Sequence, residues 1–179
     1  MMIYENFPTV EEILSEHRNQ IGDVYAGYRN HVYRMIHFCL AFRECTETEK
    51  QKIFIAGAFH DIGIWTEDTL DYLPPSIELA AEYLKKKGLQ DWEKEITLMI
   101  DMHHKLTEYK SLDYPLVEVF RKADLADFSL GAVKNGLSES IVSEVKNAFP
   151  NSGFHKFLTK LALKWAMKHP LNPAPIMKW

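Results

Sequence analysis

The stretch Ala58-Phe59-His60-Asp61-Ile62-Gly63 places two ionisable side chains at the end of an apolar run. Residues before His60 recur on one face at spacings of three and four, which predicts a helix over about 49–61. Neighbouring helical residues point about 100° apart, so His60 and Asp61 reach a common point only near a helix end or irregularity. Gly63 is typical of a helix end. The stretch therefore predicts a helix whose last residues present an imidazole and a carboxylate together.

Most other segments show the same helical period, and no segment alternates convincingly as a strand does. We expect Thr9 and Thr48 to cap helices and Gly88 to close one. The pattern predicts an all-α domain of seven to nine helices. Besides 49–61, the long helices expected are approximately 23–42, 76–88, 91–103, 138–148 and 153–169, together with one that Asp113 and Pro115 open and that includes Asp124.

Composition excludes several classes of protein. The chain has 179 residues, 46% of them hydrophobic and 26% charged, which fits one globular domain. Two cysteines make neither a disulfide framework nor a cysteine-rich zinc module. The net charge of −4 is a poor electrostatic match for long nucleic acid or an anionic membrane.

We expect a cytoplasmic protein. The N-terminal residues do not resemble a signal peptide. The longest apolar run, 53–59, is far below the length that spans a bilayer. The prolines of 170–179 predict an extended tail after the last helix.

A stripe of basic residues lies along one face of the last predicted helix. Its lysines are four residues apart, which predicts a solvated face beside an apolar one. Binding to an acidic partner is the alternative. The stripe consists of Lys156, Lys160, Lys164 and Lys168.

Four ionisable side chains fall on otherwise apolar helical faces. They are His31, His60, His103 and Asp124. A single buried histidine is more often a satisfied core residue than a metal ligand. Buried polar groups are costly unless they are paired. Four of them on four helices therefore favour convergence on one metal ion or one polar pocket.

At these residues the sequence resembles the HD-domain superfamily of metal-dependent phosphohydrolases. Three segments carry the resemblance, in the order and rough spacing of that family: Tyr28-Arg29-Asn30-His31-Val32-Tyr33-Arg34, Ala58-Phe59-His60-Asp61-Ile62-Gly63 and Arg121-Lys122-Ala123-Asp124. They span about 25–128. The resemblance implies a helical bundle with a metal at its centre. We expect one domain over 1–179, with further helices over 137–169.

The resemblance also implies a ligand set and a reaction. The ligands would be His31, His60, Asp61 and Asp124. Imidazole and carboxylate suit one divalent transition metal, namely Mn, Fe, Co, Ni or Zn. The expected function is hydrolysis of a small phosphoester, such as a nucleotide, through a metal-activated water, with Asp61 as a catalytic residue.

The sequence leaves several roles open for the pair His103-His104. Either histidine would serve as general acid, as phosphate contact, as metal ligand or as a structural residue. Relatives with two metals carry a further histidine on the helix after the His-Asp doublet. No histidine occurs between Asp61 and His103, so we expect one metal and disfavour a second.

Cations near the motif are candidate substrate contacts. Arg34 follows His31 by one turn, and a guanidinium suits phosphate through paired hydrogen bonds. Lys105 and Lys122 each flank a candidate site residue. The alternatives are a salt bridge for Arg34 and an ordinary surface position for the lysines.

Two rival functions stay open at this point. Some proteins with this fold are di-iron oxygenases, which need more ligands than the four-residue motif supplies. A non-catalytic domain that binds a metal or ligand is the other rival.

Overall fold

The computed structural model describes residues 2–178, which are helical apart from turns, loops and one isolated bridge between Lys105 and Lys178. Eight helices in this part of the chain have nine residues or more, as the sequence predicted. The helices are α1 (Pro8–Glu16), α2 (Arg18–Ile21), α3 (Tyr25–Phe42), α4 (Glu47–Phe59), α5 (Gly63–Thr66), α6 (Leu73–Lys87), α7 (Glu93–Met102), α8 (Pro115–Phe128), α9 (Glu139–Ala148) and α10 (Phe154–Lys168). Two 3₁₀ turns, Gly22–Val24 and Gln90–Trp92, precede α3 and α7.

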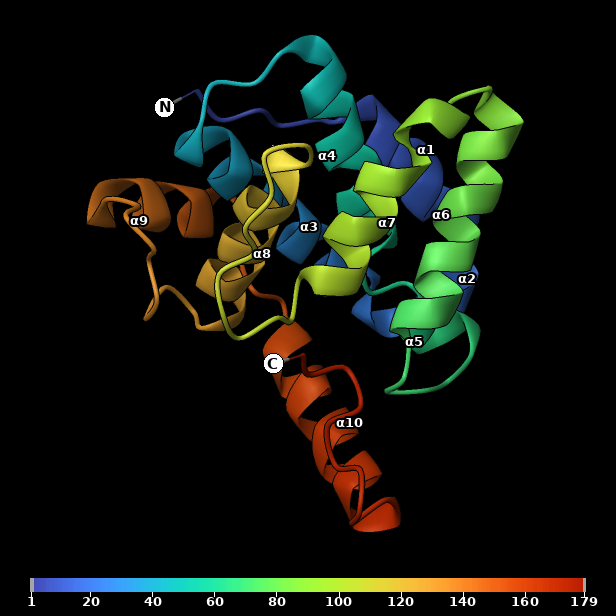
Figure 1. Cartoon of the computed structure of the whole chain (residues 1–179). Helices are drawn as coiled ribbons and strands as arrows, with labels where there is room; N and C mark the ends of the chain where they lie inside the picture. The colour runs from blue at the N-terminus through green and yellow to red at the C-terminus, as the bar shows by residue number, and fades with distance from the viewer. Residues whose placement is uncertain (1, 179) are drawn as a thin grey trace.

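Four helices form the centre of the molecule. Helix α3 packs against α4 and α8, and α7 packs against the same two helices. Helices α1, α6 and α9 cover α4, α7 and α3 from outside, while α10 projects from the body (Figure 1). Each central helix carries a candidate site residue on it or just after it. The packing of these four helices therefore brings the motif together.

Helix α3 is the most deeply enclosed of these elements. Eleven of its eighteen residues are buried, including the polar residues His31, Arg34 and His37. A helix that is buried on more than one face needs partners for each polar side chain. The partners of His31 and Arg34 define the site described below.

Two of the predicted caps are wrong. Helix α1 begins at Pro8, so Thr9 lies inside it. Helix α4 begins at Glu47 and is capped by Thr46 rather than Thr48, in a reciprocal capping box with Glu49. Gly88 closes α6 with a φ of 70°, as predicted.

The His-Asp doublet lies where α4 ends. Helix α4 stops at Phe59, and His60 and Asp61 occupy the turn before α5, as the sequence predicted. A Cβ on Gly63 would lie 2.5 Å from the carbonyl oxygen of Tyr72, so this close approach requires glycine. The backbone N–H of Gly63 donates to Ser76 Oγ at 2.9 Å. These contacts fix the turn that carries the doublet.

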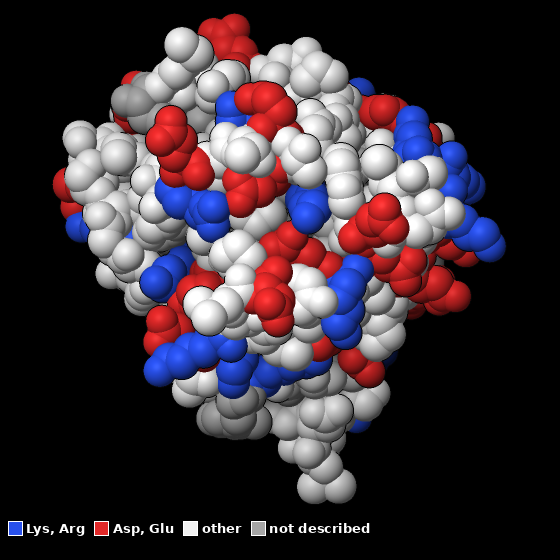
Figure 2. Space-filling model, turned by 45° about the horizontal axis from the view of Figure 1, so that its top comes forward, with Lys and Arg blue, Asp and Glu red and all other residues white. Residues whose placement is uncertain are grey.

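The C-terminal region differs from the expected extended tail. After α10 the chain makes turns, and the backbone N–H of Leu106 donates to the carbonyl oxygen of Lys178 at 2.9 Å. The four lysines of the basic stripe are exposed on α10. Acidic and basic side chains are interspersed on the face shown in Figure 2. Within residues 2–178, no helix is both long and apolar enough to cross a membrane.

Candidate metal centre

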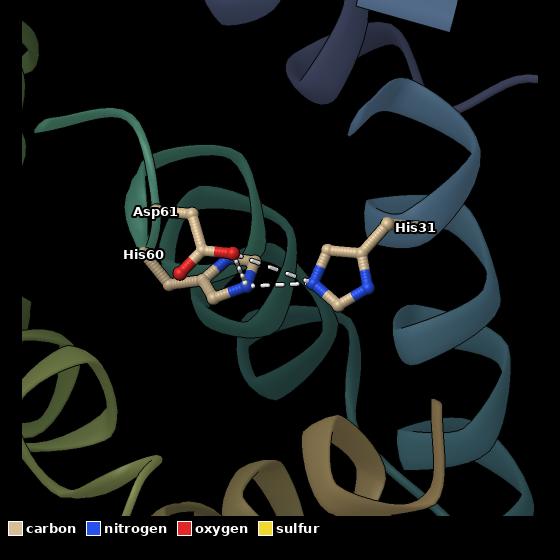
Figure 3. Close-up of side chains that lie close together, drawn as sticks. All are labelled: His31, His60 and Asp61. Atoms are coloured by element: carbon tan, nitrogen blue, oxygen red, sulfur yellow. Dashed lines mark hydrogen bonds and ion pairs between the residues drawn. The ribbon is translucent and has the colours of Figure 1, made fainter. Parts of the chain in front are cut away.

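Three of the four predicted ligands form one tight group. His31 Nε2 lies 3.0 Å from His60 Nε2 (Figure 3). Asp61 Oδ2 lies 3.3 Å from His60 Nε2 and 3.7 Å from His31 Nε2. Their ligand atoms lie within 4.8 Å of one another, and all three residues are buried. The group brings α3 and the end of α4 to one point.

The fourth predicted ligand, Asp124, comes from α8. Its Oδ1 lies 3.5 Å from His31 Nε2 and 3.8 Å from His60 Nε2. The residue is 3% exposed. The structure therefore brings together all four residues of the predicted ligand set.

Hydrogen bonds on the other ring nitrogens orient the histidines. His60 Nδ1 lies 2.8 Å from the carbonyl oxygen of Gly57, and His103 Nδ1 lies 2.6 Å from that of Ile100. A carbonyl oxygen only accepts, so each Nδ1 carries the hydrogen and donates it. In the neutral ring the Nε2 lone pair is then the free ligand atom.

These atoms fit a cation. Nitrogen and oxygen atoms that mostly accept hydrogen bonds face one another at the centre. Asp61 Oδ1 and His103 Nε2 are buried and have no hydrogen-bond partner within the described residues. A buried group without a partner is costly, and a divalent ion bound by imidazole and carboxylate satisfies both.

The electrostatics of the centre also favour positive charge. Burial disfavours the imidazolium form of His60, but the carboxylates of Asp61 and Asp124 outweigh it and raise the pKa of His60 to about 9. In the metal-free chain a proton on His60 supplies this charge. A metal ion would compete with that proton.

The two central carboxylates differ. Burial raises the pKa of Asp124, whereas contacts with His60 and His103 outweigh burial and hold the pKa of Asp61 below its usual range. Asp61 is therefore the carboxylate that stays ionised most readily. It also lies between two groups of histidines.

A second group of ligand atoms shares Asp61. Asp61, His103 and His104 also lie within 4.8 Å of one another through one ligand atom each. His103 Nε2 is 3.5 Å from Asp61 Oδ1, and His104 Nδ1 is 3.9 Å from Asp124 Oδ2. The sequence disfavoured a second metal because no histidine lies between Asp61 and His103. The structure provides a second three-residue group without that histidine.

His104 differs from the other central histidines in its exposure and partner. Its side chain is 14% exposed, against 3% or less for His31, His60 and His103. The Tyr72 hydroxyl lies 2.6 Å from His104 Nε2. Burial and the neighbouring His103 lower the pKa of His104, which keeps it neutral.

The predicted substrate contacts lie less centrally. The Arg34 guanidinium bonds to Asp127, and Lys122 Nζ lies 3.6 Å from Glu118. Lys105 follows the histidine pair, and its Nζ donates to Thr107 Oγ1 at 2.7 Å. Their roles toward substrate stay predictions. The observed partners of Arg34 and Lys122 agree with the salt-bridge and surface alternatives.

Sequence reasoning missed Asp127 and Phe154. Asp127 follows Asp124 by three residues on α8, so helical spacing could have indicated that both carboxylates lie on the same face. The Phe154 ring stacks on His31 with centroids 4.7 Å apart. No local pattern indicated that contact, because the two residues lie on distant helices.

The fold and the centre together define a helical domain with a buried histidine–aspartate site. A family model for the HD domain matches residues 28–129, which is more than half of the chain. The chain belongs to the HD domain family. No curated protein and no solved structure matched it in the other two comparisons.

Proposed function

We propose that the chain is a metal-dependent phosphohydrolase that acts on a small phosphoester. One observation carries the proposal, namely the convergence of His31, His60, Asp61 and Asp124 on one buried point within an HD domain. A divalent ion held there would lower the pKa of water toward ~7 and polarise a phosphoryl oxygen. Nucleotides are the first substrate class to test.

The chain's own residues suit parts of this reaction. His104 is the most exposed of the central histidines, so we place the leaving group of the substrate on its side. Its hydrogen bond with Tyr72 gives it a partner through which a proton can pass. Lys105, next in the chain, is the candidate cation for the phosphate.

The test is phosphate release by metal-loaded protein. The chain is purified without added metal, analysed for bound metal, and loaded with Mn²⁺, Fe²⁺, Co²⁺, Ni²⁺ or Zn²⁺. Phosphomonoesters, phosphodiesters and nucleotides are then offered. Phosphate release by the wild-type chain, together with its loss in Asp61→Ala, would support the proposal. No phosphate release with any metal across the whole panel would overturn it.

The shared carboxylate supports a second candidate, a di-iron oxygenase. Asp61 belongs to both ligand groups, so one carboxylate lies between two candidate metal positions. Two irons per chain together with substrate-dependent O₂ consumption would favour the oxygenase. One metal per chain and phosphate release would favour the phosphohydrolase.

A further inference from the structure

Asp127 is a buried carboxylate with no role in the proposed reaction. It lies on α8 one turn after Asp124 and is 3% exposed. It belongs to neither candidate ligand group of the described residues. A buried carboxylate needs hydrogen bonds or paired charge, so its partners show what it does.

Its first partner is the ligand His31. Asp127 Oδ2 lies 2.7 Å from His31 Nδ1. An ionised carboxylate only accepts, so His31 Nδ1 carries the hydrogen. His31 Nε2 then points toward His60 Nε2, 3.0 Å away, as a metal ligand requires.

Its second partner is Arg34, through a bidentate pair. Arg34 Nε donates to Oδ1 at 2.5 Å, and Nη2 donates to Oδ2 at 2.8 Å. A guanidinium that donates two hydrogen bonds to a buried carboxylate stabilises its ionised form. The carboxylate that faces His31 therefore stays ionised.

Arg34 is itself held from the C-terminal part of the chain. Its Nη1 donates to the carbonyl oxygens of Phe149 at 2.9 Å and Pro150 at 3.3 Å. These acceptors lie between α9 and α10, outside the residues that the family model matches. The Phe154 ring from the same region stacks on His31. The ring of His31 is thus fixed by a hydrogen bond on one nitrogen and by packing on its face.

We propose that Asp127 is a positioning residue that holds His31 as an Nε2 ligand, and that Arg34 holds Asp127 in turn. This inference rests on the metal site of the proposed function. A carboxylate behind a ligating histidine fixes its tautomer and orientation and raises its basicity, and its loss typically costs ~10- to 100-fold in metal affinity.

The main test measures Mn²⁺ and Zn²⁺ affinity by titration calorimetry on the full chain. Asp127→Asn is expected to weaken binding by ~10- to 100-fold. That variant also leaves the Arg34 charge unpaired, so its urea midpoint is expected to fall. A double variant, Arg34→Gln with Asp127→Asn, replaces the ion pair with neutral partners of similar size. We expect it to recover stability while its metal affinity stays low.

Glu95→Gln is a matched control. Glu95 is 7% exposed and pairs with Lys52 at 2.8 Å, and among the described residues no hydrogen bond or ion pair joins it to a candidate ligand. Its loss is expected to lower the urea midpoint without changing metal affinity. A fall in affinity equal to that of Asp127→Asn would mean that destabilisation alone weakens the site.

A second readout needs no metal. Nitrogen-15 spectra of the histidine rings report which nitrogen carries the hydrogen. We expect His31 as the Nδ1–H form in the wild type and a changed distribution in the double variant. If the wild-type chain binds no metal, both the proposed function and this inference fall. If it binds metal and the double variant binds equally well, this inference alone falls.

Discussion

Raising the pH should destabilise the metal-free chain mainly through one buried residue. His60 is fully buried, and its pKa is raised from 6.5 to about 9 by Asp61 and Asp124 against the effect of burial. A raised pKa means that the stabilisation is complete below the unfolded value of ~6.5 and is lost as the pH rises through ~9. The difference between the two pKa values corresponds to about 3 kcal/mol in all.

About 2 kcal/mol of this free energy should disappear between pH 7 and pH 8.5. The assay is urea unfolding in the presence of a chelator at several pH values in this interval. It stops at pH 8.5, where the thiols of Cys39 and Cys45 are about half ionised in the unfolded chain; burial raises their pKa values in the folded chain, so they add a smaller loss of the same sign. Saturation with Mn²⁺ should remove the loss, because the ion displaces the proton from the site.

Two variants identify the responsible group. His60→Gln should remove most of the loss between pH 7 and pH 8.5, leaving the smaller part that comes from the two thiols. His37→Gln is the matched control, because burial lowers the pKa of His37 and its titration lies below this interval. A wild-type chain whose stability does not change, or an equal loss in His60→Gln, would refute the reasoning.

Three further predictions concern the carboxylate of Asp61, the close approach at Gly63 and the cap of α4. Asp61→Ala removes the carboxylate shared by both ligand groups, so bound metal measured by elemental analysis should fall to background; retention of wild-type stoichiometry would contradict this. Gly63→Ala places a Cβ 2.5 Å from the Tyr72 carbonyl oxygen and should cost about 1–3 kcal/mol in urea unfolding, whereas an unchanged midpoint would show that the turn relaxes freely. Thr46→Ala should cost about 1 kcal/mol through loss of the capping box while metal affinity stays unchanged, and a change in affinity would mean that the start of α4 is coupled to the site.

The helical fold was predictable because it follows local spacing, whereas the four candidate ligands came from the resemblance to the HD pattern and stay a prediction. His31 lies on an apolar helical face, and His60 lies at the end of another with Asp61 directly after it. The HD pattern then joins these positions to Asp124. The structure confirms the helical fold, and it brings these four residues together.

The start of α4 shows why caps were harder to predict. Thr46 is followed three residues later by Glu49, and Thr48 is followed three residues later by Gln51, so both match the capping-box pattern. The Gln51 side chain instead accepts a hydrogen bond from Thr9 Oγ1 at 2.8 Å. That bond joins α1 to α4 across 42 residues, so no local pattern contains it.

The partner of Arg34 shows the same limit within the site. Spacing placed Arg34 one turn from His31, and phosphate was one reasonable acceptor for its guanidinium. The observed acceptor, Asp127, lies 93 residues further along the chain. Only the packing of α3 on α8 brings the two together.

The carbonyl acceptors of Arg34, on Phe149 and Pro150, also determine at what stage of protein synthesis the site can be completed. Pro150 lies 116 residues after Arg34, so a ribosome that adds about 5–20 residues per second delivers it roughly 6–23 s later. Phe154, which packs on His31, emerges later still. A nascent chain released before these residues has its family motif but lacks the contacts that hold Arg34 and cover His31. Termination after Asp127 and before Phe149 would therefore yield a protein with all four candidate ligands and an unfinished site.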